Sequence, residues 1–96
     1  MKPLISIIIP CKEIDSYAKE CVEYCKQLNY ESYEVVLLPD DTSAEIEDVK
    51  VISTGPITPG AKRNIGISNS NGELCAFIDS DAYPRKDWLI NAKKYF

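Results

Sequence analysis

Histidine is absent from the sequence, and no two cysteines form a C-x-x-C pair. The first absence excludes a mixed cysteine–histidine zinc site, and the second disfavours a paired-cysteine redox or metal site. The four cysteines are Cys11, Cys21, Cys25 and Cys75. We expect four reduced thiols, three of them filling apolar space, because cysteines of cytosolic proteins are mostly reduced.

Long apolar runs are also absent. Residues 4–9 form the longest run near the N-terminus, and Ser6 interrupts it. A bilayer span needs about 20 apolar residues, and a signal-peptide core needs about 7–15. We therefore expect a cytoplasmic location, although a longer parent protein could be membrane-associated through a segment outside this chain.

Basic residues are in the minority, with 11 Lys and Arg against 15 Asp and Glu and a net charge of −4. This balance argues against a nucleic-acid partner, because phosphate backbones attract basic faces. It is compatible with one nucleotide held through a metal ion. The 96 residues are 45% hydrophobic and 27% charged, which fits one soluble globular domain, or part of one, over residues 1–96.

Continuous apolar and β-branched runs predict buried strands at residues 4–9, 34–38 and 74–78, and a shorter edge strand at 49–53. Between them, helical spacing predicts one helix from Asp15 or Ser16 to residue 28 and another from Pro59 to residue 70. A last helix should follow Pro84, with Trp88 and Leu89 facing inward.

The first helix has a candidate apolar face, and the second contains an unfavourable residue. The predicted face of the first consists of Tyr17, Cys21, Tyr24, Cys25 and Leu28. Gly66 in the second costs about 1 kcal/mol of helix propensity relative to alanine. Close helix–sheet contact or close approach to a ligand would explain this glycine.

Alternating strands and helices predict an α/β sandwich around a mainly parallel sheet. Ligands of such sheets collect beyond the carboxyl ends of the strands. Three acidic loops follow strands here, at residues 10–13, 40–43 and 79–81. Their expected convergence at one edge is stronger evidence for a site than any one loop.

Asp79 and Asp81 are the strongest chemical signal. Residues i and i+2 leave a strand on the same side, so both carboxylates can face one ligand. A hard cation such as Mg²⁺ or Mn²⁺ prefers oxygen ligands and commonly shares them with a phosphate. The alternative is that the two side chains only cap backbone amides of the loop.

Two further pairs are open to two interpretations each. Asp40 and Asp41 can bind the polar edge of a heterocycle or form an Asx turn. Lys62 and Arg63, in the first turns of the second helix, can balance a diphosphate or can simply be solvated.

Four motifs occur in one order along the chain. They are residues 5–10 (ISIIIP), 33–43 (YEVVLLPDDTS), 60–67 (GAKRNIGI) and 72–81 (GELCAFIDSD). In this order they resemble the N-terminal, nucleotide-sugar-binding half of family 2 glycosyltransferases, which have the Rossmann-like GT-A fold, a three-layer sandwich. Lys62 is an extra residue between the alanine and arginine of the third motif.

The resemblance implies a role for individual residues. Asp41 would contact the base, usually uracil, in a pocket bordered by Pro10 and Glu13. Arg63 would lie near the diphosphate or base, Asp79 near the ribose, and Asp81 would bind Mg²⁺ or Mn²⁺ on the diphosphate. The implied reaction transfers a sugar from a nucleotide-diphosphate donor, most simply a UDP-sugar, to an acceptor that could be a sugar, a lipid or a protein.

The chain also departs from the family. Cys11 and Lys12 replace an aromatic–asparagine pair, Thr42 replaces glycine, and Ala82 replaces a frequent third acid. The family's catalytic base lies beyond the D-x-D motif, and only 15 residues follow it here. We therefore expect a truncated donor-binding domain that is inactive alone and that can self-associate through a bare sheet edge.

Three alternatives stay open. A phosphatase of the haloacid dehalogenase type also has D-x-D after a strand, but on its first strand. A metal-dependent nucleotidyltransferase is related in architecture. A nucleotide-binding or assembly module without catalysis would fit the short chain.

Overall fold

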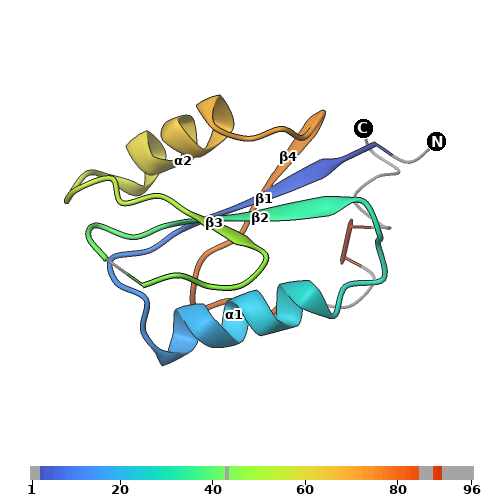
Figure 1. The fold of residues 1–96 in the computed structure, drawn as a ribbon, viewed down its shortest axis with the longest axis horizontal. Helices are drawn as coiled ribbons and strands as arrows, with labels where there is room; N and C mark the ends of the chain where they lie inside the picture. The colour runs from blue at the N-terminus through green and yellow to red at the C-terminus, as the bar shows by residue number, and fades with distance from the viewer. Residues whose placement is uncertain (1–2, 43, 85–87, 90–96) are drawn as a thin grey trace.

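The computed structural model describes residues 3–42, 44–84 and 88–89 (Figure 1). In chain order the elements are β1 (Ile5–Pro10), α1 (Ser16–Lys26), β2 (Tyr33–Leu38), β3 (Val49–Val51), α2 (Pro59–Ser68) and β4 (Leu74–Phe77). This order confirms the prediction, with element ends shifted by one or two residues. The predicted last helix lies largely outside the described residues. In the part of the chain described, no helix is both long and apolar enough to cross a membrane.

The four strands form one parallel sheet in the order β3-β2-β1-β4. β1 is central between β2 and β4, and all six of its residues are buried. A continuous apolar run is what a strand needs when both faces of its sheet are covered. β4 is less protected, since Phe77 is 43% exposed although its run was predicted to be buried.

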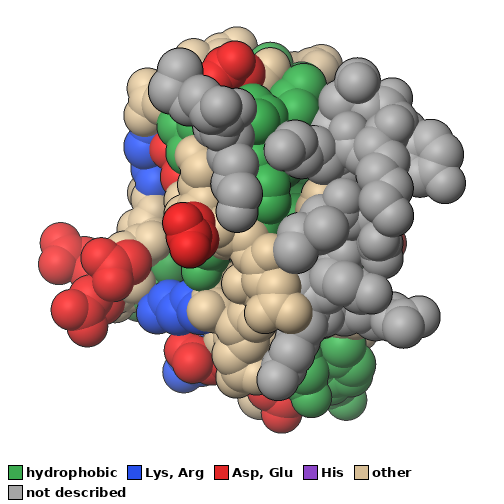
Figure 2. All heavy atoms as spheres, turned by 90° about the vertical axis from the view of Figure 1, so that its right-hand side faces the viewer, with side chains coloured by type: hydrophobic (Ala, Val, Ile, Leu, Met, Phe, Trp, Pro, Cys, Tyr) green, Lys and Arg blue, Asp and Glu red, His purple; other side chains and the backbone are tan. Residues whose placement is uncertain are grey.

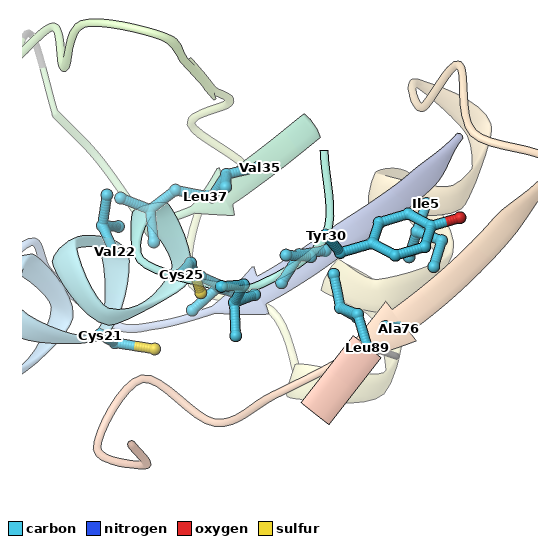
Figure 3. Packing of buried hydrophobic residues seen from close by; sticks show 12 residues of the cluster. Ile5, Cys21, Val22, Cys25, Tyr30, Val35, Leu37, Ala76 and Leu89 are labelled. Carbon is cyan, nitrogen blue, oxygen red and sulfur yellow. The ribbon is translucent and has the colours of Figure 1, made fainter. Parts of the chain in front are cut away.

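Helices cover both faces of the sheet, so the predicted three-layer arrangement is confirmed (Figure 1). Alternate residues of β1 point to opposite sides. Ile5, Ile7 and Ile9 pack in the cluster that contains the buried side of α1, and Ile8 packs in the second cluster, with Ile65 of α2. Figure 3 shows the larger cluster, which Leu89 completes.

The buried face of α1 differs from the prediction. It consists of Ala18, Cys21, Val22 and Cys25, at the i, i+3, i+4, i+7 spacing of a single helix face. Tyr17 and Tyr24, which were predicted to face inward, are exposed. The helix is rotated because the small side chains of Ala18 and Val22 fit against the sheet, while a tyrosine hydroxyl needs a polar partner.

All four cysteines are free, as predicted. Cys21 and Cys25 are buried in the α1 cluster, with Cys11 packed against it, while Cys75 packs against the cluster under α2. Each therefore contributes mainly apolar packing.

Gly66 brings α2 close to the sheet. A Cβ built at this position would lie 2.7 Å from Cγ2 of Ile8. No side chain larger than hydrogen fits there without a shift of the helix or of β1. Helix–sheet contact therefore explains this glycine, as one of the two interpretations predicted.

At the amino ends of the strands, a buried serine joins β1 to β2 and to the turn before β4. Ser6 of β1 is fully buried, donates to Glu34 of β2 at 2.5 Å, and accepts from the Gly72 amide at 2.8 Å. Glu34 also accepts from the Asn71 amide. This network fixes the turn between α2 and β4. Figure 2 shows the molecule from the right-hand side of Figure 1, where acidic side chains gather in one group at the left edge and occur singly elsewhere, with a few Lys or Arg side chains between them.

Candidate functional site

The carboxyl ends of β1, β2 and β4 meet the N-terminal end of α2 along one edge of the sheet, on the left in Figure 1. Two hollows adjoin there and share Pro10 and Pro59 as walls. The first, which we call the proline pocket, has a volume of about 310 Å³ and is lined by Pro10, Cys11, Lys12, Asp40, Pro56, Ile57, Pro59 and Lys62. The second, the acidic cleft, has a volume of about 630 Å³ and is lined by Pro10, Asp15, Tyr17, Pro59, Asp79, Ser80, Asp81 and Tyr83.

The N-terminus of α2 is fixed by the residues predicted for it. Thr58 is the N-cap and its hydroxyl accepts from the Ala61 amide at 3.1 Å, while Pro59 occupies the first turn. The cap fixes where α2 begins, and the first turns of the helix therefore hold Lys62 and Arg63 at the edge of the sheet.

Lys62 lies in an environment that the sequence did not indicate. Its side chain is 3% exposed, and its ammonium donates to the carbonyl of Cys11 at 2.6 Å, to the carbonyl of Leu38 at 3.2 Å and to Asp40 at 2.5 Å. An ammonium has three protons, and all three have protein acceptors here. Lys62 therefore has no free donor for a diphosphate in this conformation, although it lines the proline pocket.

Arg63, the other predicted cation, contacts Asp79, a residue that lines the acidic cleft. Its Nη2 lies 3.5 Å from Oδ1 of Asp79, whose side chain is 72% exposed. Its Nε is buried and is the one buried side-chain polar atom without a hydrogen-bond partner in the described residues. An exposed pair at this distance contributes little to stability. The guanidinium thus retains donors for an anion.

Asp79 and Asp81 both line the acidic cleft, as their i, i+2 spacing predicted. Both are exposed and follow the end of β4. The Asp79 carbonyl also lies 3.7 Å from the buried Cys21 Sγ, so this loop contacts α1.

Two tyrosines in the acidic cleft were missed by the sequence reasoning, which assigned Tyr17 to the core and gave Tyr83 no role. Tyr83 donates to Glu20 at 2.8 Å and packs on Tyr24 with ring centroids 5.0 Å apart. The hydrogen bond to Glu20 raises the pKa of Tyr83. Tyr17 is 57% exposed and lines the same cleft. The i, i+3, i+4, i+7 spacing of Ala18, Cys21, Val22 and Cys25 is the sequence signal that would have placed Tyr17 outside the core.

The proline pocket holds a protonated thiol. Burial raises the pKa of Cys11 to about 11, although the nearby Lys62 ammonium acts in the opposite direction. At neutral pH this thiol is therefore uncharged, a poor nucleophile and a weak hydrogen-bond donor.

The remaining predicted residues lie near the two hollows. Pro10 lines both of them. Asp41 follows Asp40 on the loop after β2, and Glu13 follows Lys12 on the loop after β1, both exposed. The Asp40 amide donates to the Lys12 carbonyl at 2.9 Å and thereby joins these loops. Contacts of Asp41 and Glu13 with a base stay predictions.

The carboxylates at this edge of the sheet fit a cation that takes only some of its ligands from the protein. The described residues contain no group of three or more potential acidic, thiol or imidazole ligands. Asp79 and Asp81 could supply one or two oxygens, so a hard cation would complete its shell with water and with phosphate oxygens. Mg²⁺ and Mn²⁺ are commonly held in this way.

A parallel sheet covered on both faces, with carboxylates and a cation-bearing helix terminus at its carboxyl edge, defines a Rossmann-like α/β architecture. The model of Glycosyl transferase family 2 matches residues 6–96, so the chain belongs to this family. An uncharacterised glycosyltransferase from Haemophilus influenzae is 33% identical over 99 residues, which cover 91% of this chain.

Two solved structures share the fold. The structure of S. aureus TarS in complex with UDP-GlcNAc has a TM-score of 0.77 and 23% identity, and covers 96% of this chain. The mannosyltransferase PcManGT from Pyrobaculum calidifontis, in complex with GDP-Man and Mn²⁺, has a TM-score of 0.80 and 21% identity, and covers 99% of it. These likenesses confirm the GT-A-type fold.

The match spans only part of each longer protein. It covers 40% of the H. influenzae relative, 30% of the TarS chain and 32% of the PcManGT chain. The similarity therefore concerns the part of these proteins that contains the parallel sheet described above.

Proposed function

We propose that this chain is the donor-binding part of a metal-dependent glycosyltransferase that uses a nucleotide-diphosphate sugar. The observation that carries the proposal is the acidic cleft, which Asp79 and Asp81 both line, together with the Arg63 guanidinium, which lies 3.5 Å from Asp79. A diphosphate bridged to a cation needs both kinds of group, carboxylates for the metal and a cation for the phosphate.

The proposed roles follow the position of each residue. Asp81 binds the cation, Asp79 binds the ribose or shares the cation, and Arg63 contacts the diphosphate. Pro10 and Glu13 border the base, and Asp41 accepts a hydrogen bond from it. Lys62 belongs to the same site through the proline pocket. When bound, Mg²⁺ or Mn²⁺ would stabilise negative charge on the leaving diphosphate. We assign no catalytic base to these residues.

UDP is the proposed nucleotide. The proline pocket has apolar walls that suit a planar base, and a carboxylate acceptor on the loop beside it suits the N3–H of uracil. The TarS structure contains UDP-GlcNAc and the PcManGT structure contains GDP-Man. Guanine is therefore the alternative that the experiment must distinguish.

The test is calorimetric titration with UDP, GDP and CDP, each with Mn²⁺ and with EDTA. We expect UDP to bind in Mn²⁺ and to lose at least tenfold in affinity in EDTA or in Asp81→Asn. Glu31→Gln is the matched control, since it removes one exposed carboxylate that lies two residues before β2, at the opposite end of the sheet. The absence of measurable binding to any of the three nucleotides would contradict the proposal.

A phosphatase assay examines the haloacid dehalogenase alternative. That family needs D-x-D on its first strand, whereas here the motif follows β4. We expect no phosphate release from small phosphoesters above the level of the Asp79→Asn variant. Release that depends on Asp79 would favour the phosphatase.

A further inference from the structure

Lys62 is the most deeply buried charged side chain in the described part of the chain, and it occupies the point where three segments meet. It extends from α2 to the ends of β1 and β2, where it donates to the carbonyls of Cys11 and Leu38. Its third acceptor is the carboxylate of Asp40, the first residue of the acidic pair after Pro39. One ammonium therefore joins a helix to two strand ends and a loop.

This arrangement depends on the charge of Lys62. Removing one partner of a buried ion pair leaves the other charge without compensation, and the two carbonyls would also lose their donor. The family resemblance gives this position no role, because Lys62 is the residue inserted in its motif. Its function must be inferred from its contacts.

Asp40, in turn, is fixed through its backbone as well as its side chain. Its amide donates to the Lys12 carbonyl at 2.9 Å, and its own carbonyl accepts from the Gly55 amide at 2.7 Å. Asp40 is thus held by the loop after β1, the segment after β3 and the Lys62 ammonium. The next residue, Asp41, is exposed, and its position depends on that of Asp40 because the two are adjacent in the chain.

We propose that Lys62 is a positioning residue that holds the Asp40–Asp41 loop so that Asp41 can read the base of the nucleotide. This inference rests on the proposed nucleotide site for its ligand readout. Lys62 itself has no proton free for the ligand. Its contribution acts through Asp41, so it affects which base is preferred as well as how tightly the nucleotide binds.

The test compares Lys62→Met with Lys50→Met in the full chain. Lys50 is a matched control, because it also donates to a backbone carbonyl of the α2 segment, that of Asn69 at 2.7 Å, but at the C-terminal end of the helix and in an exposed position. The first readout is hydrogen exchange of the Asp40 and Gly55 amides, measured by NMR. The second is the ratio of UDP to CDP affinity in Mn²⁺.

We expect exchange at both amides to accelerate at least tenfold in Lys62→Met and to remain unchanged in Lys50→Met. The affinity ratio should fall toward 1 in Lys62→Met, because cytosine has no N3–H for Asp41. In an Asp41→Ala background, Lys62→Met should cause less than a twofold further loss of UDP affinity. If Lys62→Met weakens UDP and CDP binding by the same factor, so that the UDP to CDP affinity ratio is unchanged, the positioning role is overturned.

A second variant keeps the test decisive if Lys62→Met does not fold. Asp40→Asn keeps the shape of the side chain and both carbonyl acceptors of Lys62, and it should change both readouts in the same direction but less. Unchanged exchange and an unchanged UDP to CDP ratio in Asp40→Asn would overturn the inference. If the wild type binds no nucleotide, the proposed function and the base-reading role fail together, and the exchange rates still decide whether Lys62 holds the loop.

Discussion

At the scale of single residues, two polar side chains in apolar surroundings fix the two ends of the sheet. Ser6 lies at the start of β1 and is bound to Glu34 and Gly72. Lys62 lies at the opposite end and is bound to the loop of Asp40. Each fills all or most of its hydrogen-bonding capacity, so each specifies one arrangement of the segments around it.

Glu34 gives a pH-dependent prediction. Partial burial works to raise its pKa, but hydrogen bonds from Ser6 and Asn71 outweigh this and lower the pKa below its ordinary value of 4.5. Its stabilisation is therefore fully present above pH 4.5 and is lost as the pH falls through the lower, folded-state value. Glu34→Gln should lower the free energy of unfolding by about 1 kcal/mol at pH 7.

Urea denaturation between pH 7 and pH 3 measures this effect. The difference between wild type and Glu34→Gln should shrink as the pH falls below 4.5. Exposed Glu31→Gln should keep the wild-type dependence on pH. A difference for Glu34→Gln that stays constant over this range would show that the charge of Glu34 does not act through these hydrogen bonds.

At the scale of elements, α2 connects packing to the site, because one helix carries Gly66 against β1 and Lys62 and Arg63 at the edge of the sheet. Gly66→Ala should lower the free energy of unfolding by about 1–3 kcal/mol, the usual cost of overpacking. Gly60 offers a control in the same helix, because a Cβ there would meet no atom within 4 Å. Gly60→Ala should stabilise by about 0.5–1 kcal/mol.

The urea midpoints of the two variants should move in opposite directions. Gly66→Ala should also weaken UDP binding if the helix shifts as a unit. A Gly66→Ala protein as stable as Gly60→Ala would mean that α2 does not approach β1 as closely as described.

The elements themselves were predictable because local chemistry determines them. β1 and β2 follow from β-branched runs that only a doubly covered strand can bury, and Thr58 and Pro59 mark the start of α2. The prediction that Asp79 and Asp81 face the same side rested on strand alternation; both do line one cleft, although they lie in the turn after β4 and not on the strand itself.

Other features depended on contacts between distant segments. The predicted orientation of α1 was wrong because helical spacing also allowed Tyr17 and Tyr24 on its buried face. In the structure Tyr24 instead packs on Tyr83, a residue distant in the sequence. The environment of Lys62 depends on the carbonyls of Cys11 and Leu38. Because every residue has a backbone carbonyl, the sequence does not indicate which carbonyls will accept from a lysine.

At the scale of the whole molecule, β4 is an edge strand of the sheet that the described residues form. Within the described residues β4 pairs with β1 alone, and Phe77 at its end is 43% exposed. An uncovered parallel edge can pair with another chain. We predict concentration-dependent self-association, with a light-scattering mass above the 10.8 kDa of the monomer.

A lysine substitution on β4 distinguishes association through the sheet edge from nonspecific association through other surfaces. Phe77→Lys should shift the protein toward monomer, since charged side chains on an edge strand oppose pairing. Ile67→Lys is the control, because Ile67 is 46% exposed but lies on α2. A monomeric wild type at every concentration would contradict the prediction, and an equal effect of both variants would assign association to another surface.

The central claim is that the acidic tips of neighbouring strands form one site for a cation bound to a nucleotide diphosphate. Paramagnetic broadening of amide NMR signals by Mn²⁺, with and without UDP, tests it most directly. With UDP present, we predict broadening of the Asp79 and Asp81 amides, weaker broadening of Asp41, and loss of both in Asp81→Asn. Broadening that does not require UDP, or that centres on the acidic segment at residues 45–47, would contradict the account.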